Sequence, residues 1–531
     1  MAGVACPQLL SRPSPAAPRG RHLGRHQLEA SLLPWPATGG SSSSSSSSGR
    51  SRRSPAAAAL AVVTACGSFG SLCRRWPRQW GHRSQRQRPV SVAAAAIDSS
   101  AGFPLPLELD SWLAEAKLHA DLAADVAERF GHVPQQAARV IDDAVARIER
   151  GARQCVAPCA SAHPFGSTVN GFGEASSDLD VLIAVDDEEL CYYMSYVSWH
   201  QREQRHQEAL RRSEESGLRL PEMPHPTTIS EKIAMSCAVQ QLAEFLPELG
   251  FRVVRTLPRA RKPLVTLIDR TGELEECDVS INNRLPLCNS ELLLSYSCLD
   301  CRVRPLVLLV KAWAKGKKVC GAHEGNLSSY AWTIMVIYFL QLVNLLPSLQ
   351  LLASGPRPIL DSDYWGYERS FDTSFLTAED YLQKVQAGEV AGCQGEAKHS
   401  LSMGQLLYGF FRFFSKEYSW GSEVVSIRAP ERRGADAWWR LYGKCHPEPG
   451  IHVEDPIELR DLNIVMRRER LAQLKAEFDR ATSMLEKGSS LGELLASEPV
   501  ANVMSAPYQS RRFRQNRHRA IRLPKLARPG F

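Results

Sequence analysis

Phe165-Gly-Ser-Thr-Val169, followed by Ser176-Ser-Asp-Leu-Asp-Val-Leu-Ile183, carries more structural and chemical information than any other part of this sequence. The run from Asp180 to Val185 is rich in branched apolar residues and predicts a buried strand. Asp178 and Asp180 stand two residues apart at the start of that strand, so both carboxylates point to the same side. The strand therefore presents a pair of acids a dozen residues after a Gly-Ser turn.

This acid pair predicts a cation site. Two crowded carboxylates with no basic neighbour repel each other unless a cation lies between them. Mg²⁺ is suited to the place, because it binds a few carboxylates together with substrate phosphates. Gly166 and Ser167 offer a tight backbone and a hydroxyl where a triphosphate could lie. A solvated strand end is the alternative interpretation of an Asp-x-Asp pair taken alone.

Further strands are predicted downstream of the acid pair. Phe251–Leu257 and Leu264–Ile268 have the composition of short strands, and Glu276–Ile281 alternates between apolar and polar side chains. The alternation places Asp278 on the face opposite Cys277 and Val279, which makes it the natural third carboxylate. Three Asp side chains holding two Mg²⁺ ions would activate a 3′-hydroxyl and stabilise a leaving pyrophosphate.

Helical spacing dominates the rest of the chain. It appears at 107–130, 137–148 and 228–246, and after Leu285 at 304–314, 328–346, 403–415 and 457–485. Residues 187–227 form a polar insertion with helical character. The pattern predicts a mixed α/β module followed by a mostly helical one.

These motifs resemble those of the DNA-polymerase-β-like nucleotidyltransferases, and specifically the noncanonical poly(A) polymerase and terminal uridylyltransferase family. The resemblance covers residues 105–485. It implies an α+β fold, with a catalytic palm over 105–285 and a mostly helical PAP-associated domain over 286–490, and an active-site cleft between them. It also implies that Asp178, Asp180 and Asp278 are the catalytic residues of the palm and hold two Mg²⁺ or Mn²⁺ ions. Gly166 and Ser167 form the palm's Gly-Ser motif and would contact the nucleotide.

The resemblance further implies a nucleotide pocket. Asn289 matches a ribose contact, Lys311 and Lys315 match triphosphate lysines, Ser329 and Tyr330 match a triphosphate contact and a base-stacking ring, and Asp455 and Glu458 match acids opposite the base edge. The two lysines are four residues apart and share one helical face, where they can neutralise phosphates. A solvated helix face for the lysines and a core position for Tyr330 are the structural alternatives.

The identity of the nucleotide depends on Asp461. Uridine-adding members carry a His at this position, which can donate to uracil O4. An ionised Asp accepts hydrogen bonds only, so it weakens a uridine assignment and is compatible with the amine of adenine. The remaining pocket residues favour the uridylyl branch. We therefore expect UTP as the substrate, with ATP as the alternative.

Charge divides the chain into three parts. Residues 1–97 carry a balance of +12 and residues 500–531 one of +8, so the total of +7 leaves −13 for residues 98–499. An Arg- and Ser-rich leader with one acid is typical of a transit peptide and predicts import into a mitochondrion or plastid. A disordered RNA-binding arm on a cytoplasmic protein is the alternative. The basic tail, 491–531, can bind RNA phosphates.

Composition excludes several classes of protein. No stretch approaches the 18–20 apolar residues of a membrane span, and the 14 Cys lack the spacing of a disulfide scaffold. The sequence predicts an enzyme acting on RNA 3′ ends, with a protein partner that could help to select the RNA. The rivals are a catalytically inactive RNA-binding scaffold on the same fold and a nucleotidyltransferase acting on a small molecule or protein.

Overall fold

The computed structural model describes most of the chain between its two basic ends. The described residues are 107, 109–132, 138–216, 227–355, 358–362, 368–390, 401–428, 431–435, 450–463, 466 and 468–500. All of them belong to one unit spanning residues 53–531. The predicted leader and residues 501–531 of the predicted tail lie outside the described residues.

A five-stranded mixed sheet forms the palm module. Its strands are β1 (Ser161–Phe165), β2 (Leu179–Ala184), β3 (Phe251–Leu257), β4 (Leu264–Asp269) and β5 (Cys277–Ile281), in the order β1-β2-β5-β4-β3. Strands β2 and β5 are parallel, and the other neighbours are antiparallel. The strands predicted from sequence are confirmed, and so is the α+β class.

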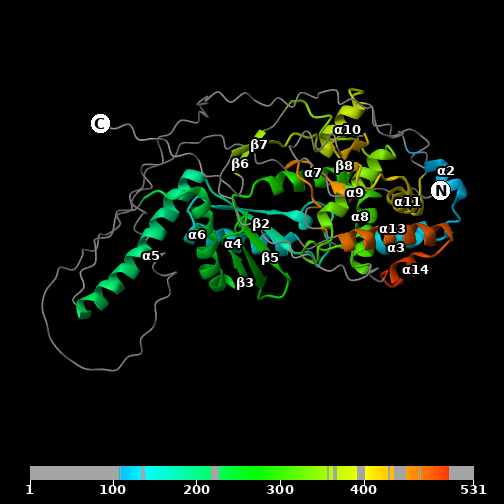
Figure 1. Ribbon diagram of the computed structural model, residues 1–531. Coiled ribbons are helices and arrows are strands. Elements are labelled where there is room, and N and C mark those ends of the chain that lie inside the picture. Colours follow the sequence, from blue (N-terminus) through cyan, green and yellow to red (C-terminus); the bar gives the residue numbers. More distant parts are fainter. Residues whose placement is uncertain are drawn as a thin grey trace, which may run out of the picture. The chain divides into compact units, whose positions relative to one another are not determined.

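Helices cover one face of this sheet. α4 (Ala138–Cys155), α6 (Glu231–Phe245) and the short η3 (Leu246–Leu249) pack on it (Figure 1). Val181 and Val279 are fully buried in the core between sheet and helices. Because side chains alternate along a strand, Asp180 and Asp278 point to the opposite face, where they are register partners.

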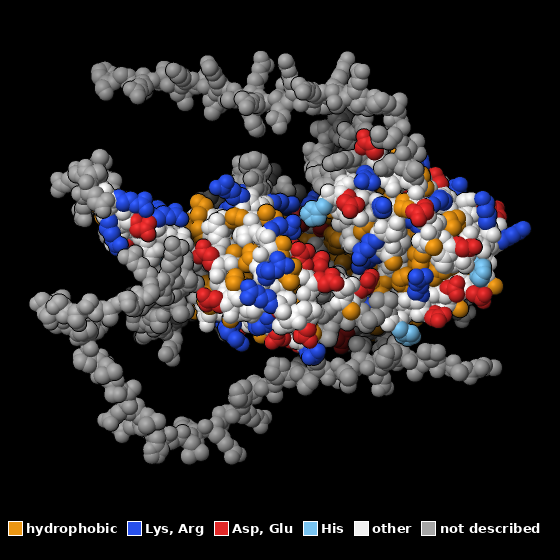
Figure 2. Space-filling model, turned by 90° about the horizontal axis from the view of Figure 1, so that it is seen from below, with side chains coloured by type: hydrophobic (Ala, Val, Ile, Leu, Met, Phe, Trp, Pro, Cys, Tyr) orange, Lys and Arg blue, Asp and Glu red, His pale blue; other side chains and the backbone are white. Residues whose placement is uncertain are grey.

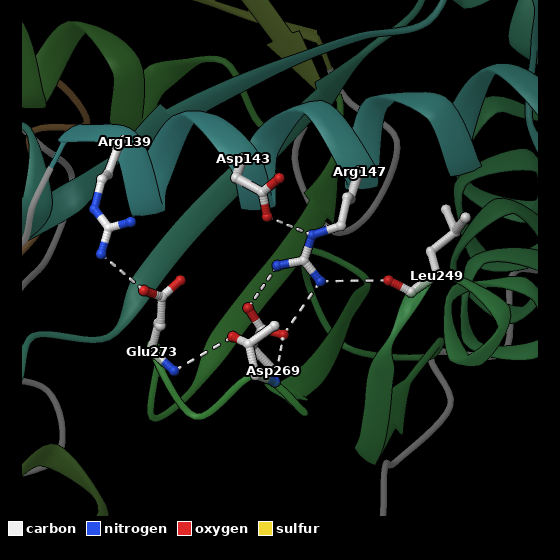
Figure 3. Close-up of polar contacts among 7 residues, drawn as sticks. Arg139, Asp143, Arg147, Leu249, Asp269 and Glu273 are labelled. Atoms are coloured by element: carbon white, nitrogen blue, oxygen red, sulfur yellow. Dashed lines mark hydrogen bonds and ion pairs between the residues drawn. The ribbon is translucent and has the colours of Figure 1, made fainter.

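Arg147 ties α4 to the sheet (Figure 3). Its guanidinium donates to both carboxylate oxygens of Asp269 at 3.1 and 2.5 Å and to Asp143 at 2.7 Å, and it lies 4.5 Å from the Phe251 ring centroid. The Asp269 side chain is only 1% exposed. Burial tends to raise the pKa of Asp269, but hydrogen bonds from Arg147 and Thr271 bring it below its ordinary value.

We expect Arg147→Met to lower the free energy of unfolding by about 3 kcal/mol, because Asp269 would stay buried without its partner. In the wild type, the depressed pKa makes the pair's contribution fully present above the unfolded pKa of about 3.9 and lost as pH falls through the lower folded value. Urea unfolding at pH 7 and pH 3 measures both effects. Arg139→Met, which removes an exposed pair with Glu273, is the matched control and should change stability little.

The second module is mostly helical. Its helices are α7 (Leu285–Leu299), α8 (Val303–Gly316), α9 (Ser329–Leu342), α10 (Ala378–Gln386), α11 (Met403–Arg412) with its π-helical continuation η6 (Phe413–Glu417), α13 (Arg468–Glu486) and α14 (Leu491–Ala496). An aromatic cluster fills its core, with Trp313 4.6 Å from Phe411 and 5.8 Å from Trp332, measured between ring centroids. In the described part of the chain, the helical module lies beside the palm (Figure 1).

Short strands interrupt the helical module. β8 (Glu423–Val425), β9 (Arg433–Gly434) and β10 (His452–Val453) form a small sheet, and β6 (Pro358–Ser362) pairs with β7 (Glu368–Asp372). Residues 457–463 are also not helical, so the helix predicted over 457–485 is too long at its start. Pro456 and the positive φ of Leu459 (56°) mark a turn there, and Asp455 accepts hydrogen bonds from the next amides.

The helices that precede the palm do not join its core. α2 (Leu109–Glu115) and α3 (Leu122–Phe130) divide the single segment expected over 107–130, and their apolar faces pack into the helical core. The sequence had placed this segment in the catalytic domain. Leu491 and Leu494 of α14 join the same core, although the sequence had placed them in the basic tail. The described part of the chain thus runs from the helical module to the palm and back.

The insertion after the first acidic strand is a long helix. α5 (Asp187–Ser216) confirms its expected helical character over the described residues. Leu190, Met194 and Val197 are buried in the palm core, while the half beyond Trp199 is polar and extends from the palm (Figure 1). Within the ranges described, no helix is long and apolar enough to cross a membrane.

Candidate active site

A cavity of about 410 Å³ collects most of the site residues that the sequence predicts. Its lining includes eleven of them: Gly166, Ser167, Asp178, Asp180, Asp278, Asn289, Lys311, Ser329, Tyr330, Asp455 and Glu458. Lys315 and Asp461 are not among the lining residues. The lining also contains residues that the sequence analysis did not select, among them Glu276, Ser290 and Arg460. A larger, open hollow beside α10 contains none of the predicted site residues.

The three acids come from neighbouring strands. Asp180 in β2 lies opposite Asp278 in β5, and Asp178 precedes β2. Burial raises the pKa of Asp180 to about 7, with further contributions from the charges of Asp278 and Asp178. Burial and the charges of Asp278 and Glu275 raise the pKa of Asp178, while the charge of Lys315 lowers it. The carboxylates therefore form one cluster whose charges disfavour each other.

This cluster fits a hard divalent cation by its donor chemistry. Carboxylate oxygens that repel one another are stabilised when a cation joins them. In the described part of the chain, no three His, Cys, Asp or Glu side chains are grouped tightly enough to hold an ion by themselves. That is compatible with Mg²⁺, whose coordination is normally completed by waters and substrate phosphates.

Gly166 lies against the carboxylate of Asp180. Its φ is +77°, and a Cβ built on it would lie 2.2 Å from Oδ2 of Asp180. Its N–H donates to Oγ of Ser290 at 2.8 Å, so this amide is engaged and not free for a phosphate. Gly166 therefore supplies space beside the acid, which the sequence analysis did not foresee. The Asn289-Ser290 segment supplies the hydroxyl that holds the turn.

The two lysines of α8 have different surroundings. Lys311 is 6% exposed, lines the cavity and donates from Nζ to the carbonyl of Phe172 at 2.9 Å. Burial and the charge of Lys315 lower the pKa of Lys311. Lys315 is exposed in the last turn of α8, near enough to Asp178 to lower its pKa. The Lys311 ammonium is thus a buried positive charge in the lining, and Lys315 lies at the margin of the cavity.

Two polar atoms in the cavity have unused hydrogen-bonding capacity. The hydroxyl of Tyr330 and Oδ1 of Asn289 are buried, and no described residue forms a hydrogen bond with either atom. Buried polar atoms in proteins normally have partners. Their position in the lining makes both atoms candidates for contacts with a bound ligand.

A cluster of acidic and basic side chains lies at the end of the lining that the helical module forms. Glu458 accepts from Arg460 at 3.1 Å and from Arg261 of the β3–β4 connection at 2.9 Å. Asp455 lies 3.8 Å from Arg460. The carboxylates of this end are therefore already engaged, and the Arg460 guanidinium lines the cavity beside them.

Asp461 is paired with His452 and does not line the cavity. Its carboxylate is 2.9 Å from Nδ1 of His452 and accepts from the amides of Val453 and Asn463. The structure does not bring Asp461 to the cavity. The sequence could not reveal this position, because the turn at 455–460 is what brings Asp461 back to His452 of β10.

Two family models match the chain. The model described as "Poly(A) RNA polymerase, mitochondrial-like, central palm domain" matches residues 128–298, and the model of the Cid1 family poly A polymerase matches residues 402–460. The first match contains the acidic strands, and the second ends at the turn that carries Asp455 and Glu458. The two matches thus cover the acidic strands and the turn at 455–460, but not α8 and α9, which contribute Lys311, Ser329 and Tyr330 to the lining.

Two whole proteins are similar to this chain in sequence. The chain is 34% identical over 295 residues to "Terminal uridylyltransferase cid1" of Schizosaccharomyces pombe, covering 52% of this chain and 68% of that protein. It is 28% identical over 379 residues to "Poly(A) RNA polymerase GLD2" of Rattus norvegicus, covering 70% of this chain and 66% of that protein. The chain therefore spans about two thirds of the length of these relatives.

Solved structures show the same fold. A cytoplasmic RNA terminal U-transferase superposes with a TM-score of 0.52 and 23% identity, over 72% of this chain and 99% of its own. The Cid1 poly(U) polymerase bound to MgGTP superposes with a TM-score of 0.52 and 24% identity, over 72% of this chain and 100% of its own. At this level of identity the likeness concerns the fold alone.

Proposed function

Because this chain belongs to the noncanonical poly(A) polymerase and terminal uridylyltransferase family, we propose that it adds nucleotides to RNA 3′ ends without a template. The observation that carries this proposal is the cavity that joins Asp178, Asp180 and Asp278 to Lys311 and Tyr330. Carboxylates for metal-dependent chemistry, a buried cation for phosphates and an aromatic ring for a base occur together there. An inactive scaffold would have no need of this set.

The three Asp side chains would hold two Mg²⁺ or Mn²⁺ ions. When bound, the ions supply charge that activates the 3′-hydroxyl and stabilises the leaving pyrophosphate. Asp278 takes the hydroxyl proton at Oδ2, since its Oδ1 already accepts a hydrogen bond from Thr266 at 2.5 Å. The RNA oxygen forms a bond to the α-phosphorus of the nucleotide, and the bond from that phosphorus to pyrophosphate breaks. Positioning and charge carry most of this step.

Lys311 and Ser167 hold the triphosphate in this proposal. The Lys311 ammonium is buried in the lining, where its charge is weakly screened, and Lys315 adds positive charge at the margin. Tyr330 stacks on the base, and Asn289 offers its unpartnered Oδ1 to a ribose hydroxyl. Ser329 begins α9, next to Tyr330, and contacts the phosphates.

We propose UTP as the preferred nucleotide and ATP as the alternative. Arg460 supports this choice, because a guanidinium only donates hydrogen bonds and therefore suits a carbonyl of uracil better than the amine of adenine. The carboxylates of Asp455 and Glu458 are engaged by Arg460, Arg261 and backbone amides. With Asp461 outside the lining, its acceptor character does not count against uracil.

Extension of a labelled oligoribonucleotide in Mg²⁺ with each NTP supplied separately tests the activity and the base choice together. We expect a ladder with UTP and at least several-fold less product with ATP. Arg460→Met should reduce that ratio, and Arg433→Met, which changes an Arg outside the cavity, should leave it unchanged. Absence of extension with every NTP would contradict the activity, and a longer ladder with ATP would contradict the base choice alone.

A further inference from the structure

A row of polar side chains crosses the palm sheet from its edge to the acid cluster. Thr266 of β4 lies opposite Arg255 of β3 on one side and Asp278 of β5 on the other, and Asp278 lies opposite Asp180 of β2. These side chains share the face of the sheet that the palm helices leave uncovered. The row links the third carboxylate to the outer edge of the sheet.

Hydrogen bonds connect the members of this row. The Arg255 Nε–H donates to Oγ1 of Thr266 at 3.2 Å, and the Thr266 hydroxyl donates to Oδ1 of Asp278 at 2.5 Å. Thr266 is fully buried. Since Arg255 can only donate, it leaves the single hydroxyl proton of Thr266 directed at Asp278. Arg255 thus fixes the direction in which the carboxylate of Asp278 is held.

A β-bulge brings Arg255 into this row. The pairing of β3 with β4 shifts between Val253 and Arg255, so that Arg255 stands opposite Thr266 where regular pairing would place Val254. Bulges redirect a side chain at the cost of a local break in the ladder, and they are frequent beside active sites. Here the residue redirected toward the acid cluster is a cation.

The outer end of the row is exposed and positively charged. Residues 251–263 contain four Arg and one Lys and no acid, in a body whose net charge is negative. The Arg255 side chain is exposed, and its two terminal nitrogens form no hydrogen bond or ion pair with any described residue. Leu257, 39% exposed, lies on the same face of β3. From below, the palm half of the molecule carries Lys and Arg side chains among hydrophobic and acidic ones (Figure 2).

We propose that this β3–β4 platform, defined as Arg255, Leu257, Arg259 and Leu264, binds the RNA strand immediately upstream of its 3′ end. Two strand spacings separate the backbones of Arg255 and Asp278 by about 10 Å, which suits a phosphate near the terminal nucleotide. Guanidinium groups bind phosphates, and apolar side chains accommodate sugars and bases. Arg255 therefore holds the RNA and positions Asp278 at once. This inference rests on the proposed function.

Three variants at one position separate the two roles of Arg255. Arg255→Ala should weaken binding of a fluorescent oligoribonucleotide about tenfold in the absence of NTP, and reduce the salt dependence by the equivalent of one phosphate contact, about 0.7 in the log–log slope. It should raise the KM for RNA without changing the KM for UTP. Arg255→Lys should restore RNA affinity but not kcat, because it lacks the Nε–H that reaches Thr266. Arg255→Gln provides a neutral variant of similar length should the Ala variant fold poorly.

Arg252→Ala is the matched control. Arg252 is exposed on the same strand and carries the same charge, but it pairs with Ile268 outside the row, so RNA affinity should change less than twofold. The inference is overturned if every Arg255 variant binds RNA with the affinity and the salt dependence of the wild type. A wild type that binds RNA through Arg255 but extends no primer would contradict the proposed function and leave the platform in place. If Arg252→Ala loses as much RNA affinity as Arg255→Ala, the loss reflects only the removal of a positive charge, and the inference is overturned.

Discussion

Asp278→Ala is expected to abolish nucleotide addition while RNA binding survives. The substitution removes the carboxylate opposite Asp180 and the group proposed to take the proton of the 3′-hydroxyl. We expect kcat to fall by at least about 10³-fold, which corresponds to roughly 4 kcal/mol of transition-state stabilisation. Single-turnover extension of a labelled primer measures the loss, and fluorescence anisotropy of the same primer measures binding.

Asp278→Asn and Glu275→Gln complete this test. The Asn variant keeps the shape and an acceptor for the Thr266 hydroxyl and removes one of three mutually repelling charges, so its fold should be as stable as that of the wild type without metal. Glu275 is exposed and its charge also raises the pKa of Asp178, but it does not line the cavity. Its Gln variant should retain nearly full activity. An Asp278→Ala protein that still extends primers at more than about 1% of the wild-type rate would remove the assignment.

Gly166→Ala is expected to have the second largest effect. The added Cβ would lie 2.2 Å from Oδ2 of Asp180, far inside van der Waals contact, so the carboxylate or the turn must move. A displacement of this kind near the reacting atoms costs about 10²-fold in rate. The positive φ adds about 1 kcal/mol or more of backbone strain, which lowers stability independently. Steady-state extension rates and thermal unfolding measure the two losses.

Gly272→Ala is an unusually close control for this substitution. Gly272 has the same φ of +77°, but a Cβ added there meets no atom within 4 Å. Both Ala variants should therefore lose a similar amount of stability from strain, and only Gly166→Ala should lose activity. Equal activity in the two variants would show that the close approach to Asp180 has no role in catalysis.

At the end of the cavity that contains Asp455 and Glu458, ion pairs already engage the carboxylates. The resemblance implies that Asp455 and Glu458 lie opposite the base edge and that Asp461 accepts hydrogen bonds at the position of a His. In the structure, the Glu458 carboxylate is shared by Arg460 and Arg261, and Asp461 pairs with His452. The Arg460 guanidinium lines the cavity beside these engaged carboxylates. A neutral or cationic variant at position 460 therefore tests base choice more directly than one at position 461.

The catalytic strands could be predicted from sequence in nearly their full extent. Alternation within β5 and the branched run in β2 report local burial, so they place Asp180 and Asp278 on one face without knowledge of the partner strands. The motif around Gly166 indicated a tight turn but not its reason. The contact with Asp180 and the hydrogen bond to Ser290 join segments that are 14 and 124 residues away.

The sequence by itself determined strands β2 to β5, helices α8, α9 and α11 and the three acids, because periodicity and residue type are local properties. Tertiary structure alone decided where α2 and α3 pack, since an apolar stripe does not specify the core that covers it. It also decided the bulge that sets Arg255 against Thr266 and the turn that removes Asp461 from the cavity. Each of these depends on the pairing of residues across separate segments, and single-sequence periodicity contains no information on such pairing.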